Sequence, residues 1–130
     1  MDFNSNKAIY LQIAEHVFEQ ILLGVWAVEE KMPSVREFAV QLEVNPNTVM
    51  RSYDFLQQME VIYNKRGIGF FVAKDSVKHI KEYKRAVFVE EDLPQLFKDI
   101  YLLDISLDEL KDRYQAFVDQ NFKTNQNENE

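Results

Sequence analysis

The chain of 130 residues contains no cysteine, which excludes disulfide bonds, a thiolate nucleophile and any metal site with cysteine ligands. It also lacks an apolar run of the ~18 residues needed to span a bilayer. Its first residues show neither the basic region nor the apolar region of a signal peptide. We therefore expect a cytoplasmic protein that does not insert into a membrane, with one modest core or a small domain carrying a helical appendage.

Sequence signatures of enzymes are missing as well. There is no P-loop, dinucleotide fingerprint, nucleophile elbow or metal-binding motif. The two histidines, His16 and His79, are far apart and have no partner at metal-ligand spacing. Acidic pairs such as Glu90-Glu91 are adjacent in sequence, and adjacent residues do not share a helix face. We expect no enzyme, no catalytic residue, no metal and no cofactor.

The charge balance is acidic, with 15 basic and 22 acidic residues and a net charge of −7. Taken alone, this balance argues against a nucleic-acid partner. However, no acidic residue lies between Val44 and Tyr53 or between Val61 and Lys74, whereas Arg51, Lys65 and Arg66 do. A local basic surface on an acidic protein is sufficient for contacts with phosphates.

Two short helices are predicted by the residues that can cap them. The Ser34 hydroxyl can accept from a free backbone N–H, and Glu37 follows at the spacing of a capping box. Asn45 can cap the second helix, with Pro46 at the first helical position, where a missing N–H costs nothing. The turn between the two helices is Glu43-Val44.

The second of these helices has two distinct faces. Val49, Tyr53 and Leu56 recur at helical spacing and are predicted to point inward. The opposite face carries polar side chains near the positive end of the helix, which suits the base edges and phosphates of a DNA major groove. This outer face consists of Asn47, Met50, Arg51 and Asp54.

A hairpin is predicted next. Residues 61–63 and 70–72 are strand-like, and Gly67 and Gly69 between them permit positive φ. Before the two short helices, residues 7–24 form an amphipathic helix, and residues 25–32 form a link that includes a short strand beside the hairpin. Two capped helices followed by a hairpin are typical of a winged helix-turn-helix.

Helical patterns continue after the hairpin. A helix is predicted from Asp75 or Ser76, and a kink or fresh start at Asp92 or Leu93, because Pro94 cannot make the next helical hydrogen bond. A final helix begins at a capping box of Ser106 and Glu109. The polar residues 124–130 are predicted to be disordered.

The chain resembles the GntR superfamily of bacterial transcription regulators, and its short helical remainder resembles the YtrA-like subfamily. The matched motifs are Met32-Pro33-Ser34-x-Arg36-Glu37-x-Ala39-x-x-Leu42, Val44-Asn45-Pro46-Asn47-Thr48-Val49-x-Arg51 and Lys65-Arg66-Gly67-x-Gly69-x-Phe71-Val72. Three positions depart from the family pattern. Glu30 and Glu43 stand where glycine is common, and Pro46 stands where many relatives carry arginine.

The resemblance implies a sequence-specific, homodimeric DNA-binding regulator, a repressor that binds an inverted-repeat operator and controls a transporter operon. Two other functions stay open: a winged-helix module that binds protein, and an architectural DNA binder with little sequence preference. The candidate DNA-contacting residues are Ser34, Arg36, Asn45, Asn47, Thr48, Met50, Arg51, Lys65, Arg66 and Gly67.

The predicted fold is mainly α with a small β-hairpin wing. A winged helix-turn-helix domain (1–74) is followed by a helical dimerisation region (75–123) and the tail (124–130). The later helices carry more apolar side chains than they can bury alone, so a second copy is the expected cover. The candidate dimerisation residues are Val77, Ile80, Tyr83, Val87, Leu96, Ile100, Leu110, Tyr114 and Phe117.

A small-molecule effector is also left open. The dimerisation region has too few residues to enclose a pocket of a few hundred cubic ångströms by itself. An effector would therefore bind in a groove between protomers or between domains, and the regulator could also work without one.

Overall fold

The computed structural model describes residue 3 and residues 7–123. The chain divides into two compact units, residues 1–85 and residues 86–130. The tail predicted to be disordered, 124–130, lies outside the described residues. Within the described part, no helix combines the length and the apolar character needed to cross a membrane.

The first unit begins with helix α1, Ile9–Leu22, which supplies one wall of the core. Ile13, Ala14 and Val17 on its inner face are fully buried. The helix ends where predicted, at Gly24, whose φ of 78° is left-handed. Val25 N donates to Gln20 O at 2.9 Å and closes the last turn.

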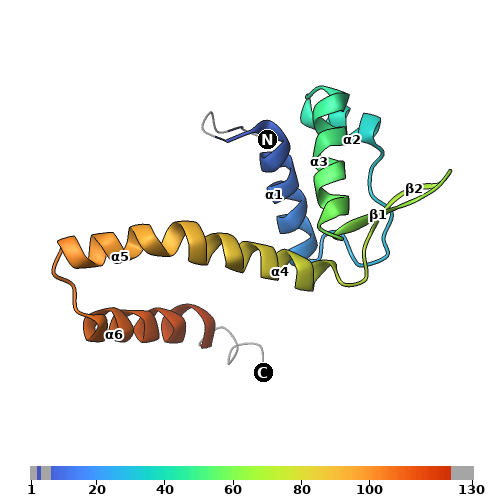
Figure 1. The fold of residues 1–130 in the computed structure, drawn as a ribbon. Helices are drawn as coiled ribbons and strands as arrows, with labels where there is room; N and C mark the ends of the chain where they lie inside the picture. Colours follow the sequence, from blue (N-terminus) through green and yellow to red (C-terminus); the bar gives the residue numbers. More distant parts are fainter. Residues whose placement is uncertain (1–2, 4–6, 124–130) are drawn as a thin grey trace. The chain divides into compact units, whose positions relative to one another are not determined.

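Helices α2, Val35–Leu42, and α3, Pro46–Gln58, form the predicted helix pair. Ser34 Oγ accepts from Glu37 N at 3.1 Å, and Asn45 Oδ1 accepts from Asn47 N at 2.8 Å. Both predicted N-caps are therefore confirmed. Figure 1 shows α1, α2 and α3 clustered, with the hairpin extending away from them.

Glu30 and Glu43, which stand where glycine is common in the family, lie in or beside turns that differ from each other. Glu43 ends α2 in the left-handed region, with φ 56° and ψ 47°, so a glycine-like conformation is adopted by a residue with a side chain. In the other turn, the left-handed residue is Glu29, with φ 67°, and not Glu30. Glu30 instead accepts a hydrogen bond from Ala27 N at 2.7 Å through its carboxylate.

The hairpin pairs β1, Ile62–Lys65, with β2, Gly69–Val72, in an antiparallel register that places Ile62 opposite Val72. The predicted short strand beside the wing is present as a single bridge between Lys31 and Phe71. Met32 N donates to Phe70 O at 2.8 Å in the same segment. The link before α2 is thus hydrogen-bonded to β2, whose other edge pairs with β1.

Helix α4, Ser76–Val87, completes the core of the first unit. Its Ile80 is fully buried in the same cluster as the inner residues of α1, α3 and the wing. Trp26 packs against this cluster, with its ring 5.7 Å from that of Phe38. His79, predicted to be on an exposed face, is half-buried, and its Nδ1 lies 3.0 Å from Glu60 O.

The discontinuity predicted near Pro94 is a π-helical turn. Segment η1, Phe88–Asp92, follows α4 and leads into α5, Leu93–Leu102. The backbone at Asp92 stays right-handed helical, with φ −82° and ψ −40°. A π turn shifts the hydrogen-bond ladder by one residue, which accommodates a proline without ending the helical path.

The second unit ends with α6, Leu107–Val118, and the π-helical segment η2, Asp119–Lys123. Ser106 Oγ accepts from Glu109 N at 3.1 Å, which confirms the predicted cap. Ile105 N donates to Ile100 O at 3.0 Å, and α6 runs back along α5 (Figure 1). Among the described residues of this unit, Ile100 is the one buried hydrophobic side chain.

Candidate nucleic-acid interface

The two faces of α3 are separated as predicted. Val49, Tyr53 and Leu56 are fully buried in the core. The residues of the outer face, Asn47, Met50, Arg51 and Asp54, are all exposed. Apart from Met50, the exposed face of the helix is therefore polar, with Asn47 in its first turn and Arg51 in its second.

The core fixes how α3 sits against the start of α2. Tyr53 Oη donates to Pro33 O at 2.7 Å, and the Tyr53 ring lies 4.9 Å from the Phe70 ring, edge to face. Burial, followed by the negative charge of Glu37, raises the pKa of Tyr53 far above its usual value. The phenol therefore stays protonated and remains a hydrogen-bond donor.

Arg51 is exposed, and its guanidinium stacks on an aromatic ring of α1. The Arg51 Cζ lies 4.0 Å from the centroid of the Tyr10 ring. The two residues line a shallow depression together with Ala8, Ile9, Asn47 and Thr48. The sequence did not predict this role for Tyr10, because the contact joins two helices and none of the three matched motifs contains Tyr10.

The other candidates on the helix pair have different surroundings. Arg36 is exposed on α2 and lines a second depression with Val40 and Pro46. The side-chain oxygens of Ser34 and Asn45 already accept cap bonds, so their first role is to start the two helices.

The wing carries its positive charge at and beside the tip. Arg66 and Gly67 are exposed at the tip, where Gly67 has φ 80° and Ile68 N donates to Lys65 O at 2.9 Å. Lys65 Nζ lies 4.5 Å from the centroid of the Phe71 ring. Lys65 is thus held against an aromatic ring, whereas Arg66 projects from the tip.

Tyr63, two residues before Lys65 on β1, supports this arrangement. Its ring stacks on Phe71 at 5.8 Å, and its hydroxyl donates to the Glu29 carboxylate. The hydrogen bond to Glu29 raises the pKa of Tyr63. The aromatic pair therefore ties the outer surface of the wing to the link that precedes α2.

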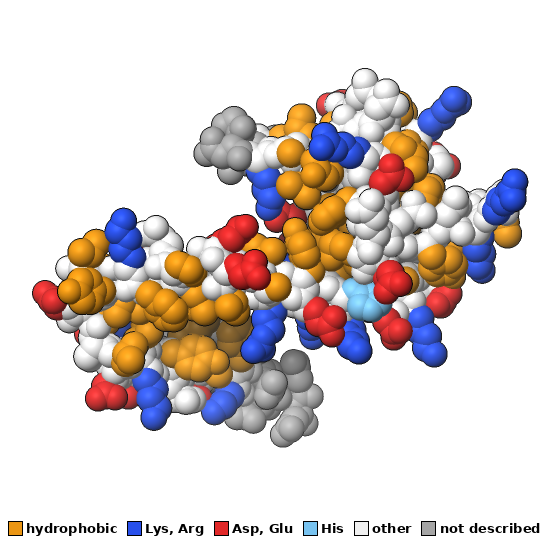
Figure 2. All heavy atoms as spheres, in the orientation of Figure 1, with side chains coloured by type: hydrophobic (Ala, Val, Ile, Leu, Met, Phe, Trp, Pro, Cys, Tyr) orange, Lys and Arg blue, Asp and Glu red, His pale blue; other side chains and the backbone are white. Residues whose placement is uncertain are grey.

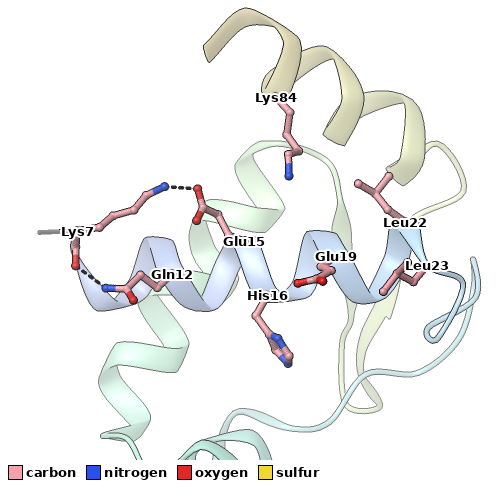
Figure 3. Close-up of a pocket in the computed structure, with 8 residues that line it drawn as sticks. All are labelled: Lys7, Gln12, Glu15, His16, Glu19, Leu22, Leu23 and Lys84. Carbon is pink, nitrogen blue, oxygen red and sulfur yellow. Dashed lines mark hydrogen bonds and ion pairs between the residues drawn. The ribbon is translucent and has the colours of Figure 1, made fainter. Parts of the chain in front are cut away.

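A separate open groove runs along α1 and the end of α4, as Figure 3 shows. Lys7 forms an ion pair with Glu15, and Gln12 Nε2 donates to Lys7 O at 2.7 Å. Glu19 and Lys84 add one charge of each sign. The mixed charges, partly paired with each other, favour no particular class of ligand.

The candidate dimerisation residues fall into two groups. Ile80 is fully buried, and Val77 and Tyr83 pack against the same core, so this part of α4 belongs to the interior of the first unit. Val87 and Leu110 are half-buried, and Ile100 is 8% exposed. The exposed candidates are Leu96 at 39%, Tyr114 at 66% and Phe117 at 58%.

Although the apolar stripe predicted after Pro94 includes Phe97 and Leu103, several exposed apolar side chains on and beside the same helices are not among the candidate dimerisation residues. They are Phe88, Val89, Phe97, Tyr101, Leu102, Leu103, Leu107 and Phe122. Figure 2 shows hydrophobic side chains gathered over this unit. The helical spacing of apolar residues in 76–122 is the sequence signal that indicates such a surface.

A capped helix pair, a hairpin with a basic tip and a polar outer face on the second helix define a winged helix-turn-helix protein. A family model for bacterial regulatory proteins of the gntR family matches residues 9–72. The chain belongs to the GntR family and is a helix-turn-helix transcription regulator.

Relatives match over nearly the whole chain. The HTH-type transcriptional regulator YhcF of Bacillus subtilis is 32% identical over 117 residues, which cover 90% of this chain and 95% of YhcF. The HTH-type transcriptional repressor YtrA of the same organism is 33% identical over 110 residues, 85% of this chain and 84% of YtrA.

A solved structure has the same fold. It is described as a transcriptional regulator of the GntR family from Bacteroides thetaiotaomicron, and it superimposes with a TM-score of 0.77 at 48% identity. The match covers 87% of this chain and 98% of that protein. The similarity therefore includes the helices after the wing as well as the winged helix itself.

Proposed function

We propose that this regulator binds a specific DNA operator as a homodimer and represses transcription from it. The observation that carries the proposal is the outer face of α3, on which Asn47 and Arg51 are exposed while the opposite face is fully buried. In helix-turn-helix proteins, the second helix of the pair is the element that enters the major groove, and α3 is that helix here.

Within the groove, Arg51 donates to a guanine edge or a phosphate, and Asn47 and Thr48 reach the backbone or base edges beside it. Arg36 on α2 contacts the phosphate backbone, which α2 crosses. Arg66 and Gly67 at the wing tip lie against the adjacent minor groove. The exposure of Asn47, Arg51, Arg36 and Arg66 supports these roles, because each of these side chains is reachable from outside.

Dimerisation is supported by the exposed apolar side chains of α5 and α6. Phe97, Tyr101 and Tyr114 are 55%, 82% and 66% exposed in the single chain. Contiguous apolar surface of this kind marks a protein–protein contact, and a second copy provides a symmetric cover. The dimer then reads an inverted repeat with half-sites about 34–36 Å apart, or a multiple of that.

Repression follows when the bound dimer excludes the transcription machinery from its operator. The repressor YtrA, to which this chain is 33% identical, supports this direction of control. We place the protein in the cytoplasm, where the operator DNA of a bacterium lies, and assign it no catalytic activity. An effector would act at a groove between protomers or between domains.

The test is selection of bound fragments from the genome of the host, followed by titration of the selected operator. Arg51→Ala should weaken operator binding by about 1–3 kcal/mol and reduce the dependence on salt by about one phosphate contact. An architectural binder would lose affinity equally on all sequences. A protein-binding module would show no affinity for DNA even at low salt, which would overturn the proposal.

A further inference from the structure

We propose that Tyr10 on α1 positions the guanidinium of Arg51 for DNA recognition. The inference rests on the proposed function and adds a helix outside the helix-turn-helix to the interface. Arg51 Cζ lies 4.0 Å from the centroid of the Tyr10 ring, well inside the ~6 Å range of a cation–π contact.

Stacking on Tyr10 is compatible with a contact to DNA. The guanidinium carries its five N–H donors in its own plane, so an aromatic ring over one face leaves the donating edges available. A bidentate contact with guanine O6 and N7, or with a phosphate, uses those edges. Among the described residues, Arg51 takes part in none of the ion pairs, so no carboxylate occupies its donors.

The Tyr10 ring is itself held in place by the core. It meets the Phe55 ring edge to face at 6.2 Å, and Phe55 meets Tyr83 in the same way at 5.8 Å. Tyr83 in turn lies 5.8 Å from Phe18, which is 1% exposed. This series of ring contacts makes Tyr10 a fixed platform and not a mobile surface side chain.

A fixed Tyr10 ring makes DNA binding more favourable by restricting Arg51 in the unbound protein. An arginine on a solvent face loses side-chain freedom when it binds, which weakens the complex. Stacking on Tyr10 restricts Arg51 before DNA arrives, so less freedom is lost on binding. Tyr10 and Arg51 also line one depression with Asn47 and Thr48, which places the platform beside the start of the recognition helix.

The experiment is a double-mutant cycle on operator affinity, measured by fluorescence anisotropy with the full-length chain. The variants are Tyr10→Leu, Arg51→Ala and the two together, with Tyr10→Phe as the matched control that keeps the ring. Tyr10→Leu should weaken operator binding about threefold to tenfold in the wild-type background. Tyr10→Phe should leave the affinity unchanged, and Tyr10→Leu should have no further effect once Arg51 is alanine.

Equal losses from Tyr10→Leu in both backgrounds would overturn the inference, because Tyr10 would then act independently of Arg51. Thermal melting of each variant checks the fold, and Tyr10→Met provides a second ringless replacement if Tyr10→Leu does not fold. An Arg51→Ala variant with wild-type affinity would instead overturn the proposed contact between Arg51 and DNA, which is a different result.

Discussion

Tyr53 Oη donates a hydrogen bond of 2.7 Å to the carbonyl of Pro33, 20 residues earlier in the chain. Tyr53 lies on the buried face of α3, and Pro33 directly precedes Ser34, the N-cap of α2. This bond joins α3, the proposed recognition helix, to the start of α2. The angle between the two helices therefore depends on a buried group that lies outside the proposed DNA-contacting face.

Tyr53→Phe should destabilise the protein by about 1 kcal/mol, because the Pro33 carbonyl loses its partner while the ring still fills the core. The free energy of unfolding in urea measures this loss. The matched control is Tyr63→Phe, whose hydroxyl bonds to Glu29 at the surface. The control should change stability by less than about 0.5 kcal/mol, and equal losses from both variants would contradict the prediction.

Stability should fall at high pH because of the same residue. In the unfolded chain Tyr53 has a pKa near 10, whereas burial raises its pKa in the folded chain. Above the pKa of Tyr53 in the unfolded chain, the unfolded state releases a proton that the folded state retains. Unfolding therefore becomes more favourable as the pH rises. Urea titrations from about pH 9 to about pH 11 should show this decline, and Tyr53→Phe should make it shallower. An unchanged decline in Tyr53→Phe would assign the effect to other tyrosines.

Glu43→Gly should stabilise the winged-helix unit by about 1 kcal/mol. Glu43 has a left-handed backbone at φ 56°, where a side chain is strained and glycine is not. The control Glu43→Ala removes the charge but keeps Cβ, so its melting temperature should stay below that of Glu43→Gly. Equal melting temperatures would show that the carboxylate, and not the backbone conformation, determines the difference.

Phe97→Glu should disrupt the proposed dimer. The Phe97 side chain is 55% exposed on α5, and a charge there cannot be buried against a second copy without a large cost. Sedimentation should show a dimer for the wild type at about micromolar concentration and a monomer for the variant. Operator affinity should fall at least about tenfold, because the two half-sites are no longer bound together.

The matched control for this variant is Lys98→Glu, at the next and also exposed position of α5. It introduces the same side chain on a polar position and should leave the dimer intact. A wild-type protein that sediments as a monomer, or a Phe97→Glu variant that remains dimeric, would contradict the proposed interface.

Features decided by neighbouring residues were predictable from the sequence. Ser34, Asn45 and Ser106 cap their helices with side-chain oxygens that accept from N–H groups two or three residues away. The chain itself holds such groups close together, so residue type and spacing suffice. At Pro94 the sequence predicted an irregularity, and its form, a π turn, depended on how the following helix continues.

The sequence by itself determined which segments form helices and strands, and which face of α3 is apolar, because these depend on periodicity and on contacts within a few residues. The tertiary structure alone decided that Tyr10 stacks on Arg51, that Tyr53 bonds to Pro33 and that Ile80 belongs to the winged-helix core. Each of these contacts joins elements far apart in the chain. Their geometry is set by the packing of whole helices, which no short sequence motif determines.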